Sequence, residues 1–115
     1  MAGLEGLPYS PSFDAGDWVV ISGQLGVRDG VLVEGFEAEV DQCLANLLTR
    51  LEDNGLGPQH VVKTTCMLTD LDRFAEFNER YAAVFTDPRP ARTTFEVSRL
   101  PLGASVEVEA WAKKP

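Results

Sequence analysis

The sequence predicts an α+β fold, in which a mixed β-sheet carries two helices on one face. Two segments have the 3.6-residue period of amphipathic helices, and the other apolar segments are short and rich in β-branched residues. The segments follow one another in the order β-β-α-β-α-β-β, which one sheet and two helices accommodate most simply as two layers. With 115 residues, the chain is expected to form a single domain over residues 1–115.

The first part of the chain is expected to be extended. Residues 18–22 are β-rich and follow the turn-like residues 15–17, so they are predicted to form a strand. Residues 27–33 are predicted to form a hairpin, because Asp29 and Gly30 suit the positive backbone angles of a type I′ turn.

The first helix is predicted over residues 36–54. Its apolar stripe, spaced i, i+4, i+7, i+8 and i+11, consists of Val40, Leu44, Leu47, Leu48 and Leu51. Gly55 stands where helices commonly end in a left-handed glycine. Cys43 lies beside the stripe and is expected to be a buried structural thiol.

The second half of the chain repeats the alternation of strand and helix. A strand is predicted over residues 61–68, and residues 69–72 offer side chains that can cap a second helix. The buried stripe of that helix is expected to be Phe74, Phe77, Tyr81, Val84 and Phe85. The proline-containing segment 87–90 ends it, and strands over residues 92–97 and 105–112 complete the fold.

Two helices on one face leave the other face of the sheet uncovered within one chain. An uncovered face with apolar content is normally buried against another subunit. The small size of the chain also limits the surface that it can bury alone. We therefore expect an oligomer.

Composition disfavours several partners. The net charge of −8 and the pI near 4.5 repel the phosphate backbone, so general nucleic-acid binding is not expected. No apolar run approaches the ~20 residues that cross a bilayer, and residues 1–10 lack the blocks of a secretory signal. We expect a cytoplasmic protein with no membrane partner, and two reduced cysteines fit that compartment.

The inventory of reactive side chains excludes several kinds of site. With one histidine, His60, the chain can form neither a His/Cys metal cluster nor a pair of catalytic histidines. No serine has a nucleophile-elbow context, and no glycine-rich phosphate motif is present. Arginine, carboxylate, tyrosine and backbone groups remain, and these suit the binding of a small carboxylate-bearing molecule.

Several short segments follow one another in an order and spacing that strongly resemble the RidA/YjgF family, over about residues 8–113. They are Pro8-Tyr9-Ser10-Pro11, Ile21-Ser22-Gly23-Gln24, Val62-Lys63-Thr64-Thr65, Phe77-Asn78-Glu79-Arg80-Tyr81, Pro90-Ala91-Arg92-Thr93-Thr94-Phe95-Glu96-Val97, Leu100-Pro101 and Val106-Glu107-Val108-Glu109-Ala110. The resemblance implies a chorismate-mutase-like fold and a homotrimer with active sites in clefts between subunits. It also implies hydrolysis of 2-aminoacrylate and related enamine or imine intermediates to a 2-keto acid and ammonia, without metal or organic cofactor.

Position by position, the resemblance implies that Arg92 grips the substrate carboxylate and that Glu107 positions the hydrolytic water. A guanidinium offers a carboxylate two parallel charge-assisted hydrogen bonds. A carboxylate can orient and partly deprotonate water that adds to an imine carbon. Other readings stay open: Arg92 could form a surface salt bridge, and Glu107 and Glu109 could face solvent on a half-buried strand.

Three further residues match positions that line the family cleft: Tyr9, Ser22 and Asn78. Gly23, beside Ser22, is expected to contact the substrate as well. The resemblance implies that Tyr9 covers the substrate across the subunit boundary. The missing side chain of Gly23 permits a close approach of the backbone. Asn78 has an alternative role as a structural helix residue that bonds to a neighbouring loop.

Thr94 departs from the cysteine that many family members carry at this position. By alternation, Arg92 and Thr94 share one strand face, whereas Phe95 points the other way and is expected to join the core. The β-branched side chain of Thr94 reshapes the pocket floor and with it the substrate preference. It also keeps open a second hypothesis, a ligand-binding or chaperone-like module without turnover.

A third hypothesis is a ribonuclease or translation inhibitor, an activity also attributed to this family. The net charge and the lack of a histidine pair disfavour it.

Overall fold

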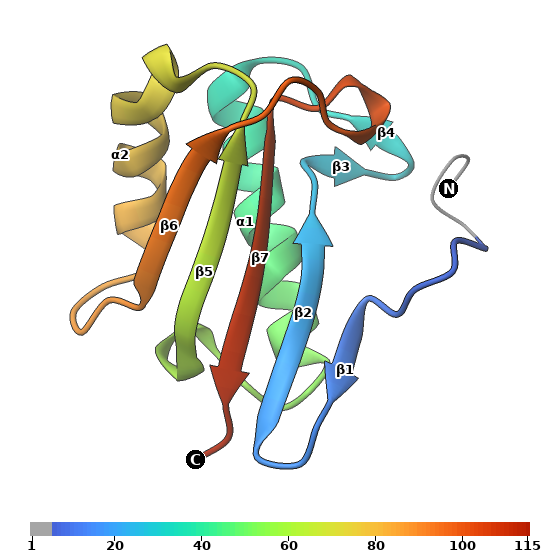
Figure 1. Ribbon diagram of the computed structural model, residues 1–115, viewed down its shortest axis with the longest axis vertical. Coiled ribbons are helices and arrows are strands. Elements are labelled where there is room, and N and C mark those ends of the chain that lie inside the picture. Colours follow the sequence, from blue (N-terminus) through green and yellow to red (C-terminus); the bar gives the residue numbers. More distant parts are fainter. Residues whose placement is uncertain (1–5) are drawn as a thin grey trace.

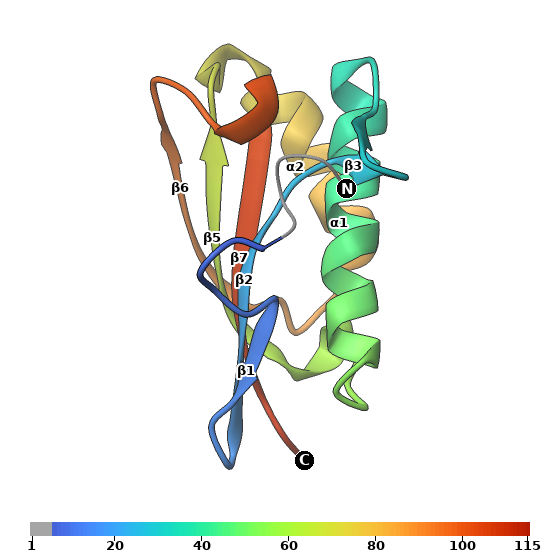
Figure 2. The same ribbon diagram turned by 90° about the vertical axis from the view of Figure 1, so that its right-hand side faces the viewer.

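A five-stranded mixed sheet carries both helices on one face in the computed structural model, which describes residues 6–115 (Figures 1 and 2). The strand order is β1-β2-β7-β5-β6, and all neighbouring strands are antiparallel except β5 and β6, which are parallel. The sheet consists of β1 (Ser12–Asp14), β2 (Trp18–Gln24), β5 (Val61–Leu68), β6 (Ala91–Glu96) and β7 (Val106–Lys113). The predicted α+β class and the two-layer packing are confirmed.

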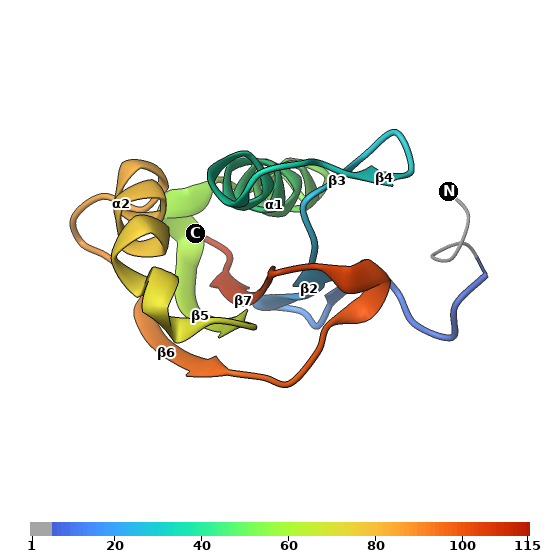
Figure 3. The ribbon, with the colours of Figure 1, turned by 90° about the horizontal axis from the view of Figure 1, so that it is seen from above.

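A short ribbon lies outside the main sheet. It pairs β3 (Val27–Arg28) with β4 (Val31–Leu32) and extends beside the helical layer (Figure 3). Asp29 and Gly30 have φ angles of 52° and 82°, as a type I′ turn requires, so the predicted hairpin is confirmed. The sequence analysis missed β1, a strand of three residues that pairs with residues 19–21 of β2.

Helix α1 (Phe36–Glu52) lies across the sheet and supplies much of the core. The predicted stripe is buried, with Leu48 at its margin, and Cys43 is buried beside it. The helix ends two residues earlier than predicted. Gly55, with φ of 73°, turns the chain so that the Leu56 N–H donates to the Leu51 carbonyl at 2.9 Å.

Helix α2 (Phe74–Val84) follows a 3-10 turn (Leu71–Arg73) that the Asp70 carboxylate caps. Phe77, Tyr81 and Phe85 are buried as predicted. Phe74 is 40% exposed, so its assignment to the buried stripe was wrong. It stands in the first turn of the helix, where its ring faces the Arg92 side chain rather than the core.

The face of the sheet opposite the helices is uncovered in a single chain and carries aromatic side chains. Phe13, Trp18 and Trp111 are exposed there, and the two indole rings meet edge to face at 6.4 Å. Phe95 lies on this face and is 42% exposed, so the prediction that it joins the core was wrong. Strand β6 alternates as predicted, but its helix-facing positions are those of Arg92 and Thr94.

No helix within residues 6–115 combines the length and the apolar character needed to span a bilayer.

Candidate active site

A cleft of about 1060 Å³ opens where β2 and β7 lose their regular pairing. The pairing is continuous from Trp18 opposite Lys113 to Ile21 opposite Ala110, and it resumes with Gln24 opposite Val108. This register leaves one extra residue on β2, a bulge at positions 22 and 23. The cleft is lined by Gly6, Leu7, Tyr9, Pro11, Ser22, Gly23, Gln24, Leu25, Val27, Asn46, Arg50, Pro101, Leu102, Glu107 and Glu109.

Glu107 and Gly23 are in direct contact across this bulge. Val106 and Val108 are buried under the helices, so the alternation of β7 turns Glu107 to the opposite face. A Cβ atom placed on Gly23 would overlap the Glu107 carboxylate. Gly23 therefore has a definite local function, because only a residue without a side chain leaves room for the carboxylate at this place.

The surroundings of Glu107 favour its use as a base. Partial burial and the neighbouring Glu109 carboxylate both raise the pKa of Glu107 above its ordinary value. A carboxylate with a raised pKa takes a proton from water more readily than a solvated one does. Glu109, which the sequence indicates as a residue that could simply face solvent, lines the same cleft.

Ser22 ties the chain before β1 to the bulge. Its hydroxyl donates to the Ser10 carbonyl at 2.6 Å, and its backbone N–H donates to the Pro11 carbonyl at 3.0 Å. These bonds hold the segment that carries Tyr9 along the rim of the cleft, where the tyrosine ring is largely exposed.

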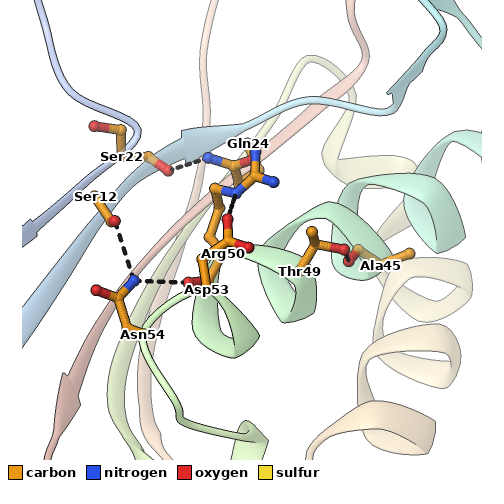
Figure 4. A network of polar contacts seen from close by, with 8 residues as sticks. All are labelled: Ser12, Ser22, Gln24, Ala45, Thr49, Arg50, Asp53 and Asn54. Atoms are coloured by element: carbon orange, nitrogen blue, oxygen red, sulfur yellow. Dashed lines mark hydrogen bonds and ion pairs between the residues drawn. The ribbon is translucent and has the colours of Figure 1, made fainter.

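Side-chain hydrogen bonds join the turn after α1 to β1 and close a contact within β2, as Figure 4 shows. The Asn54 side-chain amide donates to the Ser12 hydroxyl at 3.1 Å, and the Gln24 amide donates to the Ser22 carbonyl at 3.0 Å. Arg50, the cation of the cleft lining, is bonded to Asp53 at 3.0 Å.

Arg92 lies on the other side of the sheet, between β6 and α2. Its guanidinium carbon is 5.3 Å from the ring centre of Phe74, 5.8 Å from that of Phe77 and 4.8 Å from that of Tyr81. Among residues 6–115, no carboxylate lies within ion-pair distance of this guanidinium. The aromatic rings stabilise the cation while its hydrogen-bond donors stay available to an anion.

Asn78 and Thr94 belong to the same side as Arg92. Thr94 follows Arg92 by two residues on the helix-facing side of β6, and Asn78 comes from α2. The Asn78 Oδ1 and Thr94 Oγ1 atoms are buried, and neither has a hydrogen-bond partner in the part of the chain that the structure describes. Unpaired buried polar atoms are uncommon and call for a partner.

The predicted site residues therefore fall into two groups within one chain. Tyr9, Ser22, Gly23 and Glu107 line the cleft, whereas Arg92, Thr94 and Asn78 lie between β6 and α2. The aromatic rings beneath Arg92 had been interpreted only as core, although their i, i+3, i+7 spacing was visible in the sequence.

The two cysteines and the histidine are in surroundings that indicate structural roles. Burial raises the pKa of both Cys43 and Cys66, so their thiols stay protonated and are poor nucleophiles. The His60 ring accepts the Gly57 N–H at 2.9 Å within a 3-10 turn (Pro58–His60). Within residues 6–115, no three His, Cys, Asp or Glu side chains gather closely enough to hold a metal ion.

Known proteins are similar to this chain in sequence and in fold. A family model described as endoribonuclease L-PSP matches residues 5–114. A RutC family protein of Aquifex aeolicus is 42% identical over 111 residues, which cover 93% of this chain and 89% of that protein. The 2-iminobutanoate/2-iminopropanoate deaminase of Salmonella typhimurium is 39% identical over 110 residues, covering 91% of this chain and 86% of that protein. The crystal structure of E. coli TdcF with bound serine has a TM-score of 0.89 and 31% identity, covering 95% of this chain and 90% of that one.

Proposed function

The chain belongs to the RidA/YjgF family, whose model is described as endoribonuclease L-PSP, and we propose that it hydrolyses reactive enamine and imine intermediates of amino acids. The observation that carries the proposal is the Arg92 guanidinium, which rests on three aromatic rings with no carboxylate partner among residues 6–115. Two parallel hydrogen bonds from this group would bind the carboxylate of a 2-imino acid.

The active site that we propose is shared between two chains of a homotrimer. Arg92, Thr94 and Asn78 of one chain would bind the substrate, and Glu107 of a neighbouring chain would act on water, with Tyr9, Ser22 and Gly23 shaping the cleft. The uncovered aromatic face of the sheet supports an oligomer, because a single chain leaves it exposed to water.

The reaction requires no group beyond those side chains. An enamine first takes a proton from solvent on carbon and releases one from nitrogen, which gives the imine. Glu107 accepts a proton from water while the water oxygen bonds to the imine carbon, and the C=N electron pair moves to nitrogen, which takes up a proton. Glu107 then returns its proton to the nitrogen of this carbinolamine and the C–N bond breaks, so that ammonia leaves. The hydroxyl proton passes to solvent as the C=O bond forms, and a 2-keto acid remains.

The names of relatives support this chemistry. The Salmonella typhimurium protein is named for the deamination of 2-imino acids, and TdcF holds serine, an amino acid with the carboxylate that Arg92 would recognise.

The test measures keto-acid and ammonia release from a 2-imino acid that an amino-acid oxidase generates in the cuvette. The wild-type protein is expected to exceed the spontaneous rate. Because Arg92→Ala removes two charge-assisted hydrogen bonds, it should lower kcat/KM about 100-fold. Arg28→Ala, an exposed position in the β3–β4 ribbon, is the matched control and should keep full activity.

Other outcomes would overturn the proposal. Full activity of Arg92→Ala would exclude the carboxylate contact, and a wild-type rate equal to the spontaneous one would exclude the deaminase. Saturable binding of 2-oxobutyrate without turnover would then favour the ligand-binding module.

A further inference from the structure

Three side chains of α1 form a polar row that is hydrogen-bonded to the backbone around the cleft. Glu39, Cys43 and Asn46 are spaced i, i+4 and i+7, so they share one face of the helix. Cys43 and Asn46 donate hydrogen bonds of 2.8 to 3.1 Å to the carbonyl groups that follow the β2 bulge, those of Gln24, Leu25 and Val27.

Glu39 holds the other strand of the cleft. It is only 4% exposed, and its Oε2 atom accepts the backbone N–H groups of Ser105 at 2.7 Å and of Val106 at 3.2 Å. These two residues directly precede Glu107. A buried carboxylate therefore sets the start of β7, one residue before the group that faces the cleft.

The sheet geometry explains why a hydrogen-bond acceptor is needed there. The pairing of β2 with β7 ends at Gln24 opposite Val108, so β2 has no residue opposite Val106. A buried backbone N–H without an acceptor is costly, and Glu39 supplies the acceptor that a continued β2 would have given. The chain that follows β2 also packs against α1, because a Cβ atom on Gly26 would overlap the Glu39 backbone.

We propose that Glu39 is a positioning residue, which seats the Glu107 carboxylate against Gly23 by holding the N–H groups of Ser105 and Val106. Its catalytic consequence rests on the function proposed above. The same Oε2 atom accepts both bonds, so we expect a single neutral acceptor oxygen to be sufficient. Glutamine can present that oxygen, whereas alanine cannot.

The experiment compares three variants with the wild-type protein, below the melting temperature of all of them. Because a small displacement of a catalytic group reduces kcat strongly, Glu39→Ala should lower kcat at least about tenfold with KM within about twofold. Glu39→Gln should stay within about threefold of the wild-type kcat. Leu51→Ala creates a cavity beneath the same helix, away from the cleft. It should lower the melting temperature and leave kcat unchanged.

Amide hydrogen exchange supplies a readout that does not depend on activity. Exchange at Ser105 and Val106 should accelerate at least about tenfold in Glu39→Ala and little in Glu39→Gln. If Glu39→Ala does not fold, Glu39→Asp, which keeps the charge but shortens the reach by one methylene, should show both effects in reduced size.

An unchanged kcat in Glu39→Ala would overturn the proposal, and so would an equal loss of kcat in Leu51→Ala. Slow exchange at both amides in Glu39→Ala would also contradict it. An inactive wild-type protein would refute the proposed function alone, because the exchange data would still decide whether Glu39 holds the start of β7.

Discussion

Arg92 and Glu107 extend from opposite faces of the sheet, on the two strands that flank β5. Arg92 is opposite Thr64 of β5, and Glu107 is opposite Met67. Thr64 is buried under the helices and Met67 is three positions further, so the alternation of β5 places their neighbours on opposite faces. A substrate that touches both side chains must therefore lie between two chains, which is why the site that we propose is shared.

Gly23→Ala is expected to impair activity and stability through Glu107. The new methyl group would overlap the carboxylate, and overpacking of this kind costs about 1–3 kcal/mol. The measurement is a double-mutant cycle on the free energy of unfolding, with Glu107→Ala as the second change. Most of the cost should vanish in the Glu107→Ala background, whereas an equal cost in both backgrounds would show that another contact is responsible.

The pH dependence of activity is expected to report the Glu107–Glu109 pair. A general base must be deprotonated, so the raised pKa of Glu107 places the acid limb of kcat/KM above the ordinary range of a glutamate. Glu109→Gln removes one of the causes of this shift and should move the limb to lower pH. A limb that does not move would contradict the coupling of the two carboxylates.

The titration of Glu107 should also make the stability of the protein fall as pH rises. Because the folded state raises the pKa of Glu107, its contribution to stability is present below the ordinary pKa and is lost as pH rises through the raised value. Glu107→Gln does not titrate, so its melting temperature relative to the wild-type protein should increase from acid to neutral pH. Thermal melts at several pH values measure this difference, and a constant difference would refute the assignment.

Tyr81→Phe should separate stability from substrate binding. The Tyr81 and Thr64 hydroxyl groups share a buried hydrogen bond of 2.6 Å. Its loss leaves the Thr64 hydroxyl with only the Cys66 thiol at 3.9 Å, at a cost of about 1–3 kcal/mol. The ring that supports Arg92 remains, so KM should change little. Tyr81→Leu removes the ring as well, and a KM as low as that of Tyr81→Phe would show that the ring does not position Arg92.

Thr94→Val is expected to affect folding and substrate binding in opposite directions. The buried Thr94 hydroxyl lacks a partner within the described residues, so an isosteric methyl group should stabilise the protein by about 1 kcal/mol. If the hydroxyl serves the substrate, KM for 2-imino acids should rise. Urea unfolding and steady-state kinetics measure the two effects, and a variant that is less stable with an unchanged KM would contradict both.

The sequence predicted the turns and helix ends at which a single residue type decides the backbone geometry. Asp29-Gly30 specified the turn of the β3–β4 ribbon, and Gly55 marked the end of α1 within three residues. Strand β1 gave no such signal, because three residues show no alternation and their pairing depends on the free edge of β2. The position of Phe95 could not be predicted either, since alternation defines two faces without saying which one the helices cover.

The candidate site was likewise predictable only in part from the sequence. Arg92 and Glu107 could be selected from the sequence, because their neighbours resemble a known pattern. Their placement on opposite faces depends on the strand order β7-β5-β6, which no local segment encodes. The role of Glu39 was equally hidden, since a glutamate in the first turn of an amphipathic helix is ordinarily a solvated residue, and its partners lie 66 and 67 positions away.

The most direct test of the shared site mixes two inactive variants. Arg92→Ala and Glu107→Gln, each strongly impaired alone, are co-expressed so that oligomers contain both chains. If one chain supplies the arginine and its neighbour the glutamate, random mixing should restore about a quarter of the wild-type activity, because one neighbouring pair in four combines the two intact residues. No recovery in oligomers shown to contain both chains would contradict a site built between subunits.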